Sequence, residues 1–331
     1  MQSGTPVLNA EGPRGHGGRP GGRLGTWPNA ATVVAGVIGD PVEHSLSPAL
    51  HNAALVDLGL DWAYVAFPVP RGHAHAAVAA MADLGIRGLS VTMPHKTGAA
   101  QACDRLSPVA ERLGVANTVT NLGSHLIGDS TDGPGFVDSL LDQGWSPGGK
   151  RCLVLGAGGA ARAVALALGE AGAKRVEVVA RRAEQAERAA VLAGEAGVVG
   201  SVDGADEAEL IVNATPVGMA GVAGPPDELP FGLDPKRLGR GQLVVDLIYA
   251  PATTPLLATA RARGSSTCNG LGMLIHQAAR QVRIWTGRDP SVEVMSAAAL
   301  RELGKRAEMG TLGELPQLAE LPQPAEPGGA Q

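Results

Sequence analysis

Short apolar runs of strand length alternate with amphipathic, alanine-rich stretches between residues 32 and 309. The runs are "TVVAGVIG", "WAYVAFPV", "IRGLSVTM", "KRCLVLGA", "AKRVEVVARR", "AELIVNATPVG" and "GQLVVDLIY". Stretches such as "SPALHNAALVDLG" and "AEQAERAAVLAGEAG" follow them with a helical period. Strands that alternate with helices in this way predict mostly parallel sheets with helices on their faces. The pattern therefore predicts an α/β protein.

The alternation forms two series, which predict two successive α/β domains. The first series ends after "IRGLSVTM" and the helix that follows it, and the second begins at Lys150. The segment "NLGSHLIGDSTDGPGFVDSLLDQGW" lies between them and is predicted to form the crossover. The stretch "GLGMLIHQAARQVRIWTG" predicts a long final helix after the second series.

Both ends of the chain lack this periodicity. Residues 1–30 contain "GPRGHGGRPGGRLG", and the last residues read "ELPQLAELPQPAEPGGAQ". Segments with so few apolar residues cannot bury enough surface to offset the entropy of ordering. We therefore predict a disordered arm over residues 1–30 and a disordered tail over residues 306–331. A transit peptide is an alternative interpretation of the arm, weakened by its scarcity of serine.

Composition excludes several classes of protein. The 331 residues are 44% hydrophobic and 18% charged, as in a soluble globular protein of about two domains. A net charge of -5 and an aromatic content of 3% argue against a nucleic-acid partner. No apolar run approaches the eighteen residues of a membrane-spanning helix. Three scattered cysteines, Cys103, Cys152 and Cys268, predict reduced thiols and a cytoplasmic location, and we expect no metal site.

A glycine-rich turn between a strand and a helix predicts a dinucleotide site. The sequence Gly156-Ala157-Gly158-Gly159-Ala160-Ala161 fits G-x-G-x-x-A, directly after "RCLVLGA" and at the start of a helix. The first glycine permits the tight turn and the second lets the backbone approach a pyrophosphate. The helix N-terminus attracts the phosphates. The alternative is a glycine turn that only packs a helix tightly on a strand.

The next strand favours NADP(H) over NAD(H). An NAD site would end this strand with Asp or Glu, which binds the ribose 2′-hydroxyl. Here Ala180 is followed by Arg181 and Arg182, whose guanidinium groups suit a 2′-phosphate. A solvated helix start is the alternative. The later strand end "NATPVGM", with Asn213, Ala214 and Thr215, is expected beside the adenosine ribose and the nicotinamide.

Two serines in the first domain predict a carboxylate site. Ser45 and Ser47 are two residues apart in a segment that we expect to be extended, so both hydroxyls point to one side. Ser47 followed by Pro48 also fits a helix N-cap with proline at the first helical position. Two hydroxyls at a helix N-terminus would hold an anion, whereas capping alone is the structural alternative.

Further polar residues follow the apolar runs of the first domain. Thr92 and Lys96 end the third run, Asn117 interrupts "LGVANTVT", and Asp132 precedes a predicted glycine turn in "GDSTDGPGF". A lysine near an aspartate can transfer a proton while the carboxylate orients the ammonium group. These positions predict a small, hydroxyl-rich, acidic ligand with Lys96 as its acid/base group. A surface lysine and an Asp-Gly turn or cap are the alternatives.

Eight motifs in order make the chain resemble the shikimate/quinate dehydrogenase family between Val34 and about Gly287. They are "SLSP" with His51, "VTMPHK", "GVANT", "GDSTDG", "GAGGAARAV", "NATPVGM", "VVDLIYAP" and "GLGMLIHQAA". The resemblance implies NADPH-dependent reduction of 3-dehydroshikimate to shikimate, on the pathway to chorismate and the aromatic amino acids. It also implies a substrate-binding domain over 31–131, completed by 268–305 folding back onto it, and a Rossmann NADP-binding domain over 132–267.

The resemblance implies roles for individual residues. Lys96 and Asp132 would be the catalytic pair, with Lys96 giving a proton to the oxygen of the reduced carbonyl. Substrate binding would involve Ser45 and Ser47 at the carboxylate, Thr92, Asn117, Asp132 and Gln277 at the ring hydroxyls, and Tyr249. Gly270 and Met273 would lie near the nicotinamide, although ordinary core packing also accounts for Met273.

Two departures from the family pattern keep alternatives open. Ser90-Val91-Thr92 stands where relatives often have Asn-Val-Thr, and Ala180-Arg181-Arg182 where they often have Asn-Arg-Thr. One alternative is a paralogue acting on quinate or an amino-benzoate analogue with NAD, and another is an NADP-binding sensor without catalysis. The expected partner is a small-molecule substrate, and the expected state is a monomer or a homodimer.

Overall fold

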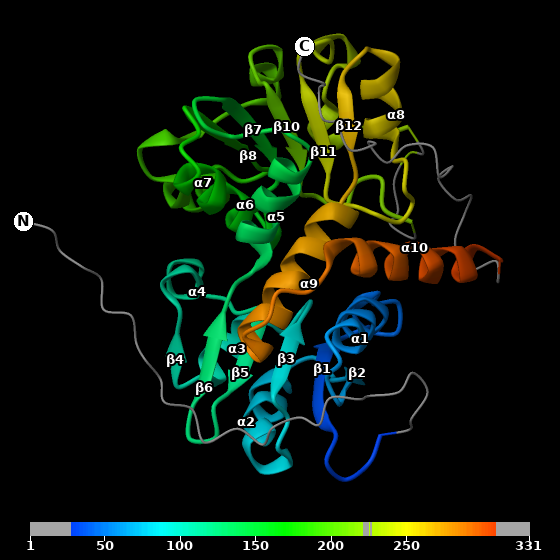
Figure 1. Ribbon diagram of the computed structural model, residues 1–331. Coiled ribbons are helices and arrows are strands. Elements are labelled where there is room, and N and C mark those ends of the chain that lie inside the picture. Colours follow the sequence, from blue (N-terminus) through cyan, green and yellow to red (C-terminus); the bar gives the residue numbers. More distant parts are fainter. Residues whose placement is uncertain (1–27, 221–224, 226, 309–331) are drawn as a thin grey trace, which may run out of the picture.

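The computed structural model describes residues 28–220, 225 and 227–308. Apart from residues 28–30 and 306–308, the two segments expected to be disordered lie outside this range. Figure 1 shows two α/β domains, one above the other, with helices α5, α9 and α10 between the two sheets. In the described part of the chain, no helix combines the length and apolar character needed to cross a bilayer.

The first sheet has six strands in the order β2-β1-β3-β5-β6-β4. Their bounds are β1 (Val33–Gly39), β2 (Trp62–Pro68), β3 (Gly88–Val91), β4 (Arg105–Leu106), β5 (Thr118–Asn121) and β6 (Leu126–Asp129). Strand β1 pairs in parallel with β2 and β3, and β4 pairs in parallel with β6. Strand β5 is antiparallel to β3 and β6, so the sheet is mostly parallel with an antiparallel insertion.

The hairpin β5–β6 differs from the predicted crossover. The backbone N–H of Leu122 donates to His125, and the Asn121 side chain accepts from the N–H of Gly123. These bonds close a tight turn between two strands of four residues each. The strands are too short to give a clear alternating pattern, so the sequence did not reveal them. The crossover itself is made only by α5 (Asp132–Asp142).

Helices lie between the strands of the first sheet along the described chain. They are α1 (Ser47–Asp57), α2 (Ala74–Leu84), α3 (Lys96–Ala102) and α4 (Pro108–Leu113). The Ser107 hydroxyl caps the start of α4 by accepting from the N–H of Ala110. Helix α2 ends at Gly85, which adopts a left-handed conformation.

The second sheet is wholly parallel, with the order β12-β11-β10-β7-β8-β9. Its strands are β7 (Arg151–Leu155), β8 (Arg175–Val179), β9 (Gly197–Val199), β10 (Leu210–Asn213), β11 (Leu243–Asp246) and β12 (Ser266–Cys268). Its helices are α6 (Gly159–Glu170), α7 (Ala183–Ala190), α8 (Pro255–Ala262) and the 3-10 turns η1 (Val191–Ala196), η2 (Val202–Asp206), η3 (Pro230–Gly232) and η4 (Pro235–Arg237). This is the doubly wound arrangement expected from the second series.

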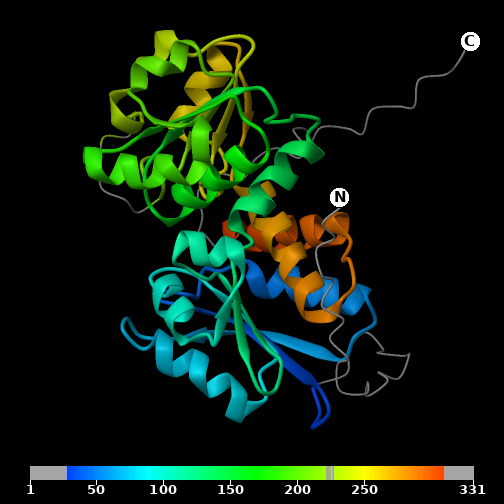
Figure 2. The ribbon, with the colours of Figure 1, turned by 90° about the vertical axis from the view of Figure 1, so that its left-hand side faces the viewer.

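The chain returns to the first domain through α9 (Leu271–Thr286) and α10 (Val292–Glu308). Both helices contribute to one apolar cluster with α1, in which Leu50, Ile275 and Met295 are buried together. Figures 1 and 2 both show α9 running from the second domain onto the first. Helix α10 includes the first three residues of the expected tail, 306–308, because its apolar positions pack against α1 as far as Leu303.

A second contact joins the domains beside α5. Leu113 and Val115, at the end of α4 and just after it, share a buried apolar cluster with Ala163 and Leu166 of α6. The Arg162 guanidinium, in the first turn of α6, donates to the carbonyl of Leu113. The two domains are therefore held together by packed side chains as well as by the chain crossings.

Candidate active site

Polar residues gather where the strands of both sheets end. In Figure 1 the arrows of β1 and β3 point toward the second domain. The parallel register pairs Ile38 of β1 with Val91 of β3, and the N–H of Asp40 donates to Met93 in the next turn. The loop that carries Ser45 therefore starts beside the turn that carries Lys96.

Lys96 and Asp132 form the centre of the site. The Lys96 Nζ lies 2.5 Å from Asp132 Oδ2, although the two residues are 36 positions apart. Their side chains are 23% and 10% exposed, so the pair is shielded but open to a small ligand. An ammonium group held in this way has further N–H groups available for a reacting oxygen.

Asn117 binds the other oxygen of the carboxylate. Its Nδ2 donates to Asp132 Oδ1 at 2.8 Å and lies 3.3 Å from Gln277 Oε1. Its own carbonyl oxygen accepts from the N–H of Thr131, and the residue is only 2% exposed. The structure thus brings together four predicted site residues, Lys96, Asn117, Asp132 and Gln277, from four separate segments.

Glycines explain how α5 brings Asp132 close to Gln277. A Cβ on Gly135 would lie 2.5 Å from the backbone nitrogen of Gln277, and one on Gly133 would lie 2.4 Å from the carbonyl of Ala163. Both glycines lie inside α5, so the predicted glycine turn after Asp132 is wrong. The glycines instead permit α9 and α6 to pack closely on α5, and Asp132 is the first residue of that helix.

The two serines lie at the start of α1, but not in the predicted conformation. Leu46 between them has helical backbone angles, so the segment is not extended. Ser47 is the first helical residue rather than the N-cap, with Pro48 after it. The N-cap position is Leu46, which offers no side-chain cap, and the Ser45 hydroxyl instead accepts from the N–H of Ser47 at 3.1 Å. Both hydroxyls remain within one turn of the helix N-terminus.

A buried polar layer lies behind Ser47, which the sequence interpretation missed. The carbonyl of Ser47 accepts from Nδ1 of His51 at 2.8 Å, and His51 Nε2 lies 3.1 Å from Gln281 Oε1. His51 is fully buried and stacks on Tyr64 with ring centroids 4.0 Å apart. Burial is the main cause that lowers the pKa of His51 to about 4, so its imidazole is neutral at neutral pH.

Ser90 belongs to the same layer. Its hydroxyl accepts from Tyr64 at 2.6 Å and donates to Gln281 Oε1 at 2.7 Å. Burial raises the pKa of the Tyr64 phenol, and its hydrogen bonds with the Ser90 and Ser47 hydroxyls oppose that rise. Ser90 stands where relatives often have asparagine, and its hydroxyl both accepts and donates a hydrogen bond within the protein. Gln281 was detectable in principle, because it lies four residues after Gln277 on the same helical face.

Thr92 and Tyr249 lie at the edges of this group. The N–H of Thr92 donates to Ile38 at the end of β1, and its methyl group packs against Gly39. Tyr249, from the loop after β11, packs on the cluster that contains Leu46 and Leu50 of the first domain. A residue of the second domain therefore reaches the segment that carries Ser45 and Ser47.

The glycine turn after β7 packs closely on the loop after β10 and leaves open space before α6. Gly156 has a φ of 122°, and a Cβ there would lie 2.9 Å from the carbonyl oxygen of Ala214. Gly158 and Gly159 are exposed, and a Cβ on either would meet nothing within 4 Å. Packing within the protein therefore does not require glycine at these two positions, and the space before α6 is free for a phosphate group. Ala157 and Ala160 are half-buried, and Ala161 is fully buried against the sheet.

Arg181 and Arg182 lie at the carboxyl end of β8, next to this turn in the sheet order. The register pairs Leu155 of β7 with Val179 of β8. Arg182 is the N-cap of α7, and both arginines are exposed with no carboxylate partner among the described residues. Two unpaired guanidinium groups beside the glycine turn fit the 2′-phosphate of NADP(H).

The loop after β10 adjoins the glycine turn, but the Asn213 side chain is occupied within the protein. It donates to Val217 and to Asp246 Oδ1, and it accepts from the N–H and hydroxyl of Thr215. Ala214 and Thr215, rather than the Asn213 side chain, line the turn at Gly156. Asp246 is fully buried, and burial raises the pKa of its carboxyl group.

Gly270 and Met273 begin α9. A Cβ on Gly270 would lie 2.0 Å from the carbonyl of Leu247, so the close approach of α9 to the loop after β11 requires glycine. Met273 is half-buried against the cluster that contains Phe136 and Leu140. Core packing thus explains part of its environment.

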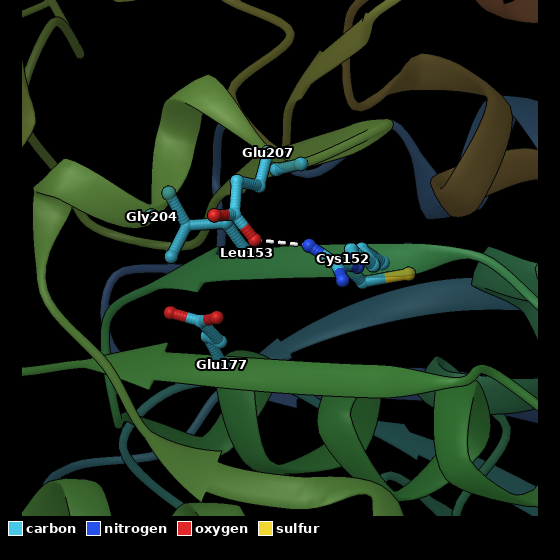
Figure 3. A pocket seen from close by; sticks show the side chains of 7 residues that line it. Cys152, Leu153, Glu177, Gly204 and Glu207 are labelled. Atoms are coloured by element: carbon cyan, nitrogen blue, oxygen red, sulfur yellow. Dashed lines mark hydrogen bonds and ion pairs between the residues drawn. The ribbon is translucent and has the colours of Figure 1, made fainter.

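Figure 3 shows a separate shallow hollow, without internal space for a water molecule, at the end of β7 opposite to the candidate site. Glu177 of β8 and Glu207 lie on two sides of it, and Glu207 forms an ion pair with Arg151. The hollow opens at the amino ends of the strands, away from every predicted site residue. No cluster of side chains suited to a metal ion occurs within residues 28–220, 225 and 227–308.

Together the fold and the site define a two-domain oxidoreductase of the nicotinamide-dependent class, with a Rossmann domain opposite a lysine–aspartate pair. Residues 37–119 match the shikimate dehydrogenase substrate binding domain, and residues 270–300 match the shikimate 5'-dehydrogenase C-terminal domain. The chain belongs to the shikimate dehydrogenase family.

Individual relatives agree over most of their lengths. The chain is 45% identical to a shikimate dehydrogenase (NADP(+)) of Geobacter sp. (strain M21), over 82% of this chain and 96% of that one. A shikimate dehydrogenase solved with NADP+ superposes with a TM-score of 0.78 at 38% identity, covering 85% of this chain and 99% of that one. The shikimate 5-dehydrogenase of Thermus thermophilus, solved with NADP(H) and shikimate, superposes with a TM-score of 0.75 at 39% identity. The match covers 82% of this chain and 99% of that one.

Proposed function

We propose that this protein catalyses the NADP-dependent interconversion of 3-dehydroshikimate and shikimate. The observation that carries the proposal is the Lys96–Asp132 pair, shielded, hydrogen-bonded at 2.5 Å and surrounded by the amides of Asn117 and Gln277. An ammonium group next to hydrogen-bonding amides suits a substrate that carries a carbonyl group among hydroxyls.

Lys96 acts as the general acid in the reductive direction. When bound, NADPH supplies the hydride that reduces the substrate carbonyl. Lys96 donates a proton to the carbonyl oxygen, and in the reverse direction it accepts the proton from the hydroxyl group. Asp132 keeps the ammonium group oriented through Oδ2, while Asn117 fixes Oδ1, so the pair needs no rearrangement when substrate enters.

The remaining residues orient the substrate. Ser45 and Ser47 bind its carboxylate with their hydroxyls, aided by the N-terminus of α1. Thr92, Asn117, Asp132 and Gln277 bind the ring hydroxyls, and Tyr249 closes the site from the second domain.

The cofactor is held by the second domain. Backbone N–H groups after Gly156 and the N-terminus of α6 bind the pyrophosphate, and Arg181 and Arg182 bind the 2′-phosphate. Ala214 and Thr215 line the same turn, and Gly270 and Met273 lie at the nicotinamide end. We assign the protein to the cytoplasm, where it acts as a monomer or a homodimer.

Reduction of NADP+ with shikimate, followed by absorbance, tests the proposal. The panel includes quinate and an amino-benzoate analogue as substrates, and NAD+ as cofactor. We expect turnover to be fastest with shikimate and NADP+. Faster turnover with quinate and NAD+ would instead identify the paralogue activity. NADPH binding without turnover of any cyclohexene acid would identify a sensor and reject the enzyme.

A further inference from the structure

The last turn of α10 reaches the loop that carries the two serines. Arg306 Nη1 donates to the carbonyl of His44 at 2.7 Å, and Nη2 donates to the carbonyl of Ser45 at 3.1 Å. The Arg306 side chain is only 17% exposed. A planar guanidinium group that binds two successive carbonyls fixes the direction of the backbone between them.

That backbone segment leads directly to the carboxylate site. The loop between β1 and α1 turns at Val42, whose carbonyl accepts from the N–H of Ser45. The Ser45 hydroxyl then accepts from the N–H of Ser47. A shift of the Ser45 carbonyl would therefore move both hydroxyls that we assign to the substrate carboxylate.

The positive charge of Arg306 also affects Tyr249, a residue of the second domain. Burial raises the pKa of Tyr249, and the positive charge of Arg306 opposes that rise. Arg306 is also paired with Glu302 one turn earlier, at 3.1 Å and with a carboxylate that is 29% exposed. The guanidinium group thus binds the serine loop directly, and its charge acts on the tyrosine from the second domain.

We propose that Arg306 is a positioning residue of the carboxylate site, which orders the Ser45–Ser47 loop and favours an anionic over a neutral ligand group. This inference rests on the proposed function and extends it to the C-terminal helix. Arg306 touches neither the reacting carbonyl nor the Lys96–Asp132 pair, so it affects substrate binding rather than the chemical step.

The test compares Arg306→Gln with Arg301→Gln, an exposed arginine on the same helix that undergoes the same change of charge. In Arg306→Gln we expect the KM for shikimate to rise about tenfold, because two charge-assisted hydrogen bonds are lost. The kcat and the KM for NADP+ stay within about twofold of the wild type. Arg301→Gln matches the wild type in all three. Arg306→Lys keeps the charge but loses the planar guanidinium group that binds two carbonyls at once. We expect it to give an intermediate KM.

Calorimetric titration with shikimate and its neutral methyl ester tests the charge preference. Wild type binds the acid more tightly than the ester, and Arg306→Gln reduces that ratio. An unchanged KM for shikimate in Arg306→Gln, or equal losses for acid, ester and NADP+, overturns the inference. The wild type is assayed alongside the variants. If it does not turn over shikimate, the result counts against the proposed function. If the wild type is active and Arg306→Gln has the same KM for shikimate, the result counts only against the role of Arg306.

Discussion

Lys96 Nζ lies 2.5 Å from Asp132 Oδ2, and each residue is the first of a different helix. Helix starts hold their side chains more rigidly than surface loops, which suits the proposed role of the pair in proton transfer. In the proposed function this pair distinguishes an enzyme from a binding protein, since cofactor binding alone does not need it.

Replacement of Lys96 tests its role in proton transfer. We expect Lys96→Ala to lower kcat by about 10²-fold or more, because general acid catalysis contributes that much. NADPH affinity, measured by fluorescence titration, stays unchanged because Lys96 lies in the other domain. Lys236→Ala, which removes an exposed lysine in η4, is the matched control and keeps full activity. Near-normal turnover of Lys96→Ala would remove Lys96 from the mechanism.

Arg181 and Arg182 are expected to determine the cofactor preference. The double change to alanine should raise the KM for NADPH by about tenfold to a hundredfold, because charge-assisted hydrogen bonds to the 2′-phosphate are lost. The KM for NADH should change little, since NADH lacks that phosphate. Arg188→Ala, in the following helix α7 and paired with Glu184, should affect neither. Equal losses for the two cofactors would contradict the assignment.

The sequence located candidate site residues best where a strong apolar run stops at a polar residue. Gly156 after β7, and Thr92 and Lys96 after β3, could be located in this way because buried parallel strands have clear ends. Local conformation was predicted less well. Ser47 and the Asp132–Gly133 pair both fit common turn and cap patterns, yet tertiary packing placed all three inside first helical turns.

The distant partners of a residue could not be found from spacing, even where the residue itself could. Gln281 is 230 positions from His51, and Arg306 is 261 positions from Ser45. Only the folded chain brings these pairs together. The short strands β5 and β6 were missed for a related reason, because four residues give too little periodicity to distinguish a strand from a loop.

His51 should make stability depend on pH in a defined direction. Its folded pKa is about 4 against an ordinary 6.5, so the unfolded chain binds more protons between these values. This contribution to the free energy of unfolding is complete above pH 6.5 and is lost as the pH falls toward 4. From pH 7 to pH 5 the loss amounts to about 2 kcal/mol.

Urea unfolding at pH 7 and pH 5 measures this loss in the wild type and in His51→Asn. The variant has no imidazole to titrate, so its stability should fall by about 2 kcal/mol less over the same interval. Carboxylates elsewhere contribute equally to both proteins and cancel in the comparison. An identical pH dependence in the two proteins would show that His51 is not protonated on unfolding.

Substitution by alanine should have opposite effects on stability at two helical glycines. One lies where α5 approaches α9 closely, and the other lies in α10 with free space around it. Gly135→Ala places a Cβ 2.5 Å from the Gln277 backbone, so the helices must separate. We expect a loss of about 1–3 kcal/mol of stability and a lower kcat, because Gln277 and Asp132 move apart. Gly304→Ala, in α10 with nothing within 4 Å, should gain about 1 kcal/mol. Thermal unfolding of both variants checks the signs.

Gly158 separates the requirements of folding from those of cofactor binding. Its φ of -73° and ψ of -174° are accessible to any residue, and a Cβ there meets nothing within 4 Å. Gly158→Ala should therefore keep the wild-type free energy of unfolding within about 0.5 kcal/mol.

The added methyl group nevertheless occupies the space that we assign to the pyrophosphate, so NADPH affinity should fall at least about tenfold. Titration of NADPH fluorescence measures the affinity, and Gly148→Ala, at a surface loop with ordinary contacts, is the control. If Gly158→Ala binds NADPH as tightly as the wild type, the phosphates do not approach the backbone at this turn, and the position of the cofactor before α6 would have to be abandoned.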